Sequence, residues 1–397
     1  MLQQSPVRLA PPDLDWRLLA PLLVNAVMVQ TVVGILRVVT SYRTIELGLS
    51  VQWLGVISAS FALLPVFSAV ALGRFIDRGN DSQVAWIGTG LILVGAIGLW
   101  GWSPSGFHLL AFTVVLGFGH MFCMMAQQML AVRSATLNGR EVAFGHFMVA
   151  ASTGQGLGPL VVGWLGGTAT VPATGYLFAI GLAAAALSFA LVFMLRPAPR
   201  LSADAGDGAV VAVSTLVRMP GMLAVITASV VTVTALDLLT IYLPVVGAER
   251  HIDASNIGIL LGIRAIAALV ARVFFSRLIA AFGRRRLTLG SILVGAAAFV
   301  ALAVPSLPVM YLAVTVVGLG LGVASTTTLS SIVDLAPEEA RGTALSLRIT
   351  GNRVGQVLVP FLSGLVAAVT GTGGILVVIG LSLAVSGAAI RLSSRLA

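Results

Sequence analysis

The chain has 397 residues, of which 58% are hydrophobic and only 9% are charged, and its formal net charge is +9. Soluble domains carry roughly 25% charged residues, so this composition excludes an ordinary soluble enzyme and predicts a protein that faces lipid. The arginines are scattered over many short loops, which argues against a nucleic-acid-binding patch and therefore against a nucleic-acid partner.

Twelve apolar segments are long enough to cross the roughly 30 Å hydrocarbon core of a bilayer as helices. The first six are expected at residues 17–42, 52–72, 84–102, 108–132, 142–167 and 174–195. The last six are expected at residues 220–247, 256–275, 287–304, 308–333, 342–369 and 373–393. We therefore predict an all-α membrane protein with 12 transmembrane helices.

A polar stretch divides these segments into two sets of six. Residues 196–219 contain prolines, glycines, acids and arginines, a composition typical of a linker. This predicts an N-terminal six-helix bundle at residues 1–195, a cytoplasmic linker at 196–219 and a C-terminal six-helix bundle at 220–397. Most arginines then fall in loops on one side, and only Arg43 and Arg250 fall in loops on the other. The positive-inside rule places both termini in the cytoplasm.

The two halves carry the same punctuating residues at nearly constant offsets. Four residues recur 201 positions later: Arg140, Gly154, Pro159 and Gly163 as Arg341, Gly355, Pro360 and Gly364. Three residues recur 203 positions later: Glu46, Gly55 and Arg74 as Glu249, Gly258 and Arg277. A parallel duplication of six helices is a transporter plan, with the substrate site between the halves near mid-membrane.

Two equivalent loops carry the halves of one motif. "GRFIDRGND" at residues 73–81 supplies Gly73, Asp77 and Arg78, and "SRLIAAFGRRR" at residues 276–286 supplies Gly283, Arg284 and Arg285. Together they resemble the loop motif of the major facilitator superfamily, although the first loop lacks the trailing basic pair and the second lacks the acid. The resemblance implies a cytoplasmic gate, and Arg272, four residues before the second loop, is expected to belong to it or to reach the interface.

A second motif lies in the segment expected at 142–167. "GHFMVAASTGQGLGPLVVGWLGG" resembles the antiporter motif of the same superfamily, with Val162 where the pattern has a glycine. The resemblance implies a close-packed, bendable helix that governs alternating access, and it points to a drug or metabolite:proton antiporter. Ordinary glycine packing is the alternative explanation. The motif positions are Gly145, Gly154, Gly158, Pro159 and Gly163.

Ionisable residues inside the predicted spans are candidates for the transport pathway, because burying an isolated charge in a bilayer is costly. Asp237 is the only acid deep in a span. Arg264, near the middle of the eighth span, is expected either to pair with Asp237 or to bind substrate or take part in proton movement. Arg37 and Arg353 are also deep, so positive charge exceeds negative charge. Arginine suits carboxylate, phosphate or sulfate, which predicts an anionic or zwitterionic cargo.

Helix periodicity adds further candidates. His120 and Gln127 are expected to face the pathway together with Met124, and His120 is either a proton carrier or a packing residue. Asn352 shares a helix face with Arg348, whereas Arg353 is expected to point elsewhere.

The sequence contains no pattern of an enzyme, an ATP-binding loop, a metal site or a cofactor site. We predict a monomeric carrier of the bacterial inner membrane that exports a small anionic or zwitterionic amphiphile by alternating access. Protons are the coupling ion, with Asp237 the first candidate carrier. Two alternatives stay open: a proton-symport importer or facilitator of an organic anion, and a non-transporting assembly or sensing protein of the same fold.

Overall fold

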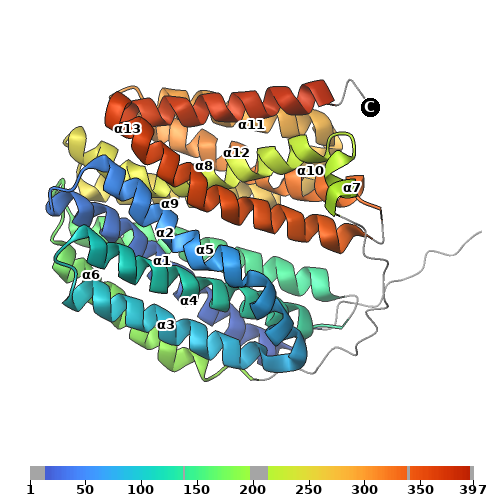
Figure 1. Cartoon of the computed structure of the whole chain (residues 1–397), viewed down its shortest axis with the longest axis horizontal. Coiled ribbons are helices and arrows are strands. Elements are labelled where there is room, and N and C mark those ends of the chain that lie inside the picture. Colours follow the sequence, from blue (N-terminus) through green and yellow to red (C-terminus); the bar gives the residue numbers. More distant parts are fainter. Residues whose placement is uncertain (1–13, 137–138, 197–212, 338–339, 394–397) are drawn as a thin grey trace, which may run out of the picture.

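The computed structural model describes residues 14–136, 139–196, 213–337 and 340–393 (Figure 1). In this part of the chain every regular element is a helix, which confirms the all-helical class. The first half contains α1 (Trp16–Glu46), α2 (Val51–Phe75), η1 (Ile76–Asn80), α3 (Asp81–Gly101), α4 (Gly106–Arg133), α5 (Arg140–Gly166) and α6 (Thr174–Val192).

The second half contains two short helices besides the long ones. Its elements are α7 (Val213–Arg218), α8 (Met222–Glu249), α9 (Ala254–Val273), α10 (Phe275–Phe282), α11 (Arg284–Ala301), α12 (Leu307–Leu335) and α13 (Arg341–Ser393). The short helix α7 lies inside the stretch predicted to be a linker. Its Leu216 is fully buried in a cluster with Met222 and Ile226, so α7 packs against the start of α8.

Nine helices of the described residues are long and apolar enough to cross a membrane. Two predicted spans, α5 and α11, form helices but are not among the nine. Both carry polar residues: α5 contains Gln155 besides Arg140, Glu141 and His146, and α11 begins with three arginines. A count of twelve spans and the cytoplasmic placement of both termini remain predictions.

Local chemistry explains where several helices begin and break. Asp15 caps α1, because its carboxylate accepts a hydrogen bond of 2.9 Å from the backbone N–H of Arg17. In α13 the helical conformation is interrupted at Gly371, whose φ of 69° favours glycine. Figure 1 shows the chain reversing there, so α13 covers both segments predicted at 342–369 and 373–393.

The helices of each half lie together, α1–α6 on one side of Figure 1 and α7–α13 on the other. Between the two sides, α5 packs against α9 and α2 packs against α13. We call the end of the molecule where α1 begins the proximal end, and the end where α1 finishes the distal end. The boundaries of the two bundles and of the linker, at residues 1–195, 196–219 and 220–397, remain predictions.

The two halves close tightly on each other at the distal end. A Cβ built on Gly258 of α9 would lie 2.5 Å from the Cα of Gly163 in α5, and one built on Gly55 of α2 would lie 2.9 Å from the Cα of Gly364 in α13. The backbone N–H of Ala254 also donates to the carbonyl of Ala169 at 2.8 Å. These backbone-to-backbone contacts are possible only because glycine has no side chain.

The two glycine contacts occupy equivalent positions of the two halves. Gly55 and Gly258 are the pair 203 residues apart, and Gly163 and Gly364 are the pair 201 residues apart. Glu46 and Glu249, again 203 apart, each accept a hydrogen bond from a threonine of their own half, Thr174 and Thr372. The repeat read from the sequence is therefore also a repeat of contacts.

Candidate substrate cavity

A cavity of about 440 Å³ lies between the two sets of helices. Helices α1, α2, α4 and α5 line it from the first half, and α8, α9, α12 and α13 line it from the second half. Its volume falls in the range of roughly 300–1,000 Å³ that is usual for small-molecule sites. Its charged lining residues are Arg37, Asp237, Arg264, Arg272 and Arg353.

A chain of four side chains crosses the cavity from α1 to α13. Nη1 of Arg37 lies 3.1 Å from Oδ1 of Asp237 and forms an ion pair with it. Nε2 of Gln356 donates to Oδ2 of the same carboxylate, and Oε1 of Gln356 accepts from Arg353 at 3.1 Å. Both oxygens of Asp237 are therefore occupied, one of them by a residue of the other half.

Arg264 is not the ion-pair partner of Asp237, which corrects that alternative from the sequence. Arg264 is only 8% exposed, and its Nε is buried without a hydrogen-bond partner among the described residues. Asp237 attracts its guanidinium, and Arg272 and Arg37 repel it. The ion-pair partner of Asp237 is Arg37 of α1, because α1 and α8 occupy equivalent positions in the two halves and meet across the cavity.

Arg272 also lines the cavity, although it was expected at the gate or at the interface. It donates a hydrogen bond to the hydroxyl of Ser152, which lies on α5. The contact again joins the two halves. Arg264 and Arg272 are eight residues apart, slightly more than two helical turns, so the same face of α9 presents both.

On α4 the structure places His120 and Gln127, which the sequence predicted to face the pathway together, in different surroundings. His120 and Met124 line the cavity, as expected, but Gln128 lines it in place of Gln127. Gln127 is fully buried and donates to Oδ1 of Asn25 on α1 at 2.7 Å. Residues 120, 124 and 128 are spaced by four and follow one face, whereas position 127 turns toward α1.

Asn352 and Arg353 both line the cavity, so Arg353 does not point away from Asn352 as expected. Arg348 contacts the backbone instead, with its Nη2 at 3.5 Å from the carbonyl of Ser325. Gln356, which joins Arg353 to Asp237, was not singled out from the sequence. Its position, four residues after Asn352 on the same helix face, is the signal that would have found it.

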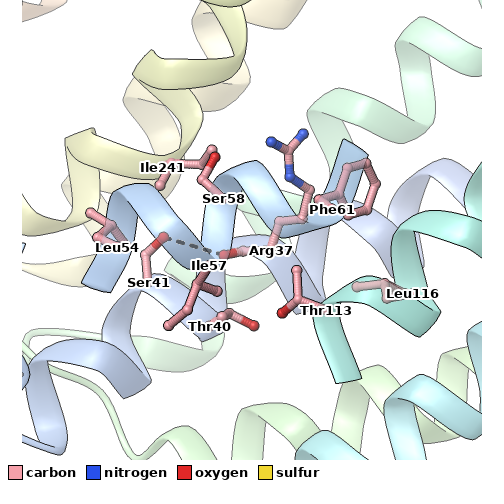
Figure 2. Close-up of a pocket in the computed structure, with 10 residues that line it drawn as sticks. All are labelled: Arg37, Thr40, Ser41, Leu54, Ile57, Ser58, Phe61, Thr113, Leu116 and Ile241. Carbon is pink, nitrogen blue, oxygen red and sulfur yellow. Dashed lines mark hydrogen bonds between the residues drawn. The ribbon is translucent and has the colours of Figure 1, made fainter. Parts of the chain in front are cut away.

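A small pocket of about 20 Å³ lies beside the cavity, and Figure 2 shows its lining. Arg37 and Phe61 line both spaces, and the Arg37 guanidinium lies 4.6 Å from the centre of the Phe61 ring. This cation–π contact holds the guanidinium beside the ring and forms a partition between pocket and cavity. Four hydroxyl side chains line the pocket: Thr40, Ser41, Ser58 and Thr113.

The motif positions of α5 have two different surroundings. Gly154 and Gly158 pack on α1, because an added Cβ would lie 2.3 Å from the carbonyl oxygen of Val27 and 2.8 Å from the Cα of Gly34, respectively. Pro159 lines the cavity. Gly163 makes the distal contact described above, whereas Gly145 has no atom near enough to require glycine.

At the proximal end the loop motif is accompanied by two ion pairs. Asp81 and Arg133 form a buried one of 2.8 Å between α3 and α4, and Arg284 and Asp334 form a more exposed one between α11 and α12. Position 284 is 203 residues after 81, and 334 is 201 after 133, so the two pairs are equivalent with their charges exchanged. Asp81 was not among the gate positions predicted from the motif.

The remaining gate positions lie in the last turn of α2, in η1 and at the start of α11. Gly73 lies in the last turn of α2 near the Met125 side chain, and Asp77 and Arg78 lie in the π-helical turn η1, where Arg78 is exposed. Gly283, with φ of 73°, precedes Arg284 and Arg285 at the start of α11.

A cavity lined by charged side chains, enclosed by membrane-spanning helices of two repeated halves and closed at one end, defines a secondary transporter that works by alternating access. The sequence profile of the Major Facilitator Superfamily matches residues 22–251 and 225–395. The chain therefore belongs to the major facilitator superfamily.

Solved transporters share this fold at low sequence identity. The nucleoside transporter NupG, as a point mutant, is 14% identical with a TM-score of 0.78, and the alignment covers 95% of this chain and 99% of that one. A D-xylose–proton symporter is 15% identical with a TM-score of 0.77, covering 94% and 97%. An inward-facing, occupied bacterial homologue of the human lysosomal transporter Spinster is 16% identical with a TM-score of 0.72, covering 95% and 96%. No curated protein sequence matches the chain.

Proposed function

We propose that this protein exports a small anionic or zwitterionic compound in exchange for protons. The observation that carries the charge preference is the cavity lining, in which four guanidinium groups face one carboxylate. Guanidinium forks bind carboxylate, phosphate and sulfate with charge-assisted hydrogen bonds. The molecule works as a monomer in the bacterial inner membrane, with its proximal end toward the cytoplasm.

Asp237 is the proposed proton carrier. Its carboxylate pairs with Arg37 of the other half and accepts from Gln356. Protonation removes the negative charge that holds Arg37, so the proton and the position of the two halves are coupled. His120 is the second candidate, since it lines the same cavity.

Direction is proposed from the glycine motif of α5, which resembles that of antiporters. The alternative, proton symport into the cell, is kept because a structural neighbour is named as a proton symporter. Proteoliposomes loaded with labelled benzoate, glutamate or phenylbutyrate test both. Antiport predicts that an inward proton gradient drives the anion out and accumulates protons inside. Symport predicts movement of both in one direction, and no flux of any of these anions overturns the proposal.

A further inference from the structure

The four cavity arginines differ in the groups that their guanidinium groups already contact. Arg37 is held by Asp237, Arg353 by Gln356, and Arg272 by the hydroxyl of Ser152. Arg264 is more than nine-tenths buried, lines the cavity and has an Nε without a partner among the described residues. A buried guanidinium with unsatisfied hydrogen-bonding capacity is costly unless a bound group supplies the acceptor.

We propose that Arg264 holds the acidic group of a monoanionic amphiphile, whose apolar body lies against the methionines of α4. This assignment rests on the proposed transport function and narrows its cargo. The methionines concerned are Met121, Met124 and Met125, which all line the cavity.

The small number of carboxylates in the cavity favours an anionic cargo over a zwitterionic one. Asp237 is the only acidic side chain among the described lining residues. Its Oδ1 accepts from Arg37 and its Oδ2 accepts from Gln356. An ammonium group of a cargo would have to compete with Arg37 and Gln356 for this one carboxylate, and it would lie among four guanidinium groups that repel it.

The methionines supply the surface for the apolar part. Methionine is unbranched and polarizable, so it adapts to aliphatic and aromatic groups alike. They belong to α4 in the first half, whereas Arg264 belongs to α9 in the second half. A cargo that contacts both bridges the two halves, and its binding energy then depends on how the halves are arranged.

Three probes are compared: phenylbutyrate is a monoanion with an apolar body, phenylbutylammonium has the same body with the opposite charge, and glutarate is a dianion without an aromatic body. Each is titrated against the full-length protein in lipid nanodiscs, and binding is measured as the rise in unfolding temperature. Phenylbutyrate is expected to stabilise the protein, and the other two are expected to have little effect. Arg264→Gln should weaken phenylbutyrate binding by about tenfold or more, because a charged hydrogen bond is lost, and Arg264→Lys should restore part of it.

Matched variants distinguish the site from general damage. Arg348→Gln removes an arginine outside the cavity and should leave phenylbutyrate binding unchanged. Met125→Gln should weaken binding by more than Met125→Leu, which keeps the volume and the apolar character. The assignment is overturned if phenylbutylammonium or glutarate binds as tightly as phenylbutyrate or more tightly. It is also overturned if Arg264→Gln binds phenylbutyrate as well as the wild type does. Failure of all three probes also overturns it, while flux of benzoate or glutamate in proteoliposomes would leave the proposed transport function standing.

Discussion

Arg37 and Asp237 form an ion pair of 3.1 Å that joins α1 of the first half to α8 of the second half inside the cavity. Neither side chain is fully buried, with 16% and 23% of the two exposed. The pair is therefore accessible to water and to a cargo, unlike the Asp81–Arg133 pair at the proximal end. It is a contact that a proton or an anion can break.

Asp237→Asn tests the role of this carboxylate. The amide cannot bind or release a proton near neutral pH, so flux driven by a proton gradient should fall by about 5- to 150-fold, the usual range of coupling between two sites. Exchange of labelled for unlabelled anion without a gradient should persist, because Arg264 remains. The comparison is made in proteoliposomes at equal protein content. Equal losses in both assays would mean that Asp237 serves binding or folding rather than coupling.

Gly258→Ala and Gly55→Ala should prevent closure of the distal end. An added Cβ would lie 2.5 Å from backbone atoms of the other half in each case, so the halves must separate there. Spin labels placed on the distal ends of α5 and α9 should report a longer distance in both variants. Gly290→Ala is the matched control, because nothing lies within 4 Å of its added Cβ. An unchanged distance in Gly258→Ala would contradict the tight contact.

Asp81→Asn and Asp334→Asn should differ in stability although they occupy equivalent pairs. The side chains of Asp81 and Arg133 are 0% and 3% exposed, so removing one charge leaves the other buried and costs about 3–5 kcal/mol of unfolding free energy. The side chains of Arg284 and Asp334 are 39% and 55% exposed, and that loss should be about 0–1 kcal/mol. Thermal unfolding of the two variants in one detergent provides the measurement, and similar losses would refute the distinction.

Gln127→Leu should damage stability rather than transport. Gln127 donates to Asn25 in a fully buried contact, and its loss leaves a buried amide unpaired at a cost of about 1–3 kcal/mol. Transport per folded molecule should equal that of the wild type. Gln128→Leu changes the cavity wall and serves as the comparison, with altered transport and a smaller effect on unfolding. A transport defect in Gln127→Leu without a stability change would place Gln127 in the pathway after all.

The sequence by itself determined the class of the protein. Apolar runs of membrane-spanning length predicted the helices, including both arms of α13, because a bilayer requires every backbone group to be paired within its own segment. The residues repeated at offsets of 201 and 203 predicted a duplicated unit, and four of them, Gly55, Gly163, Gly258 and Gly364, make equivalent contacts in the structure. The deep arginines and Asp237 were found because an ionisable residue within an apolar run is rare.

Only the tertiary structure decided which of these charges meet. The sequence offered Asp237 as one possible partner of Arg264 because α8 and α9 are neighbours along the chain, but the carboxylate pairs with Arg37, 200 residues away. Helical spacing fixes which residues share a face, not which face turns toward the cavity, so Gln127 and Gln128 exchanged roles. Pairing depends on the packing of the two halves, and a carboxylate is neutralised by whichever guanidinium that packing brings within reach.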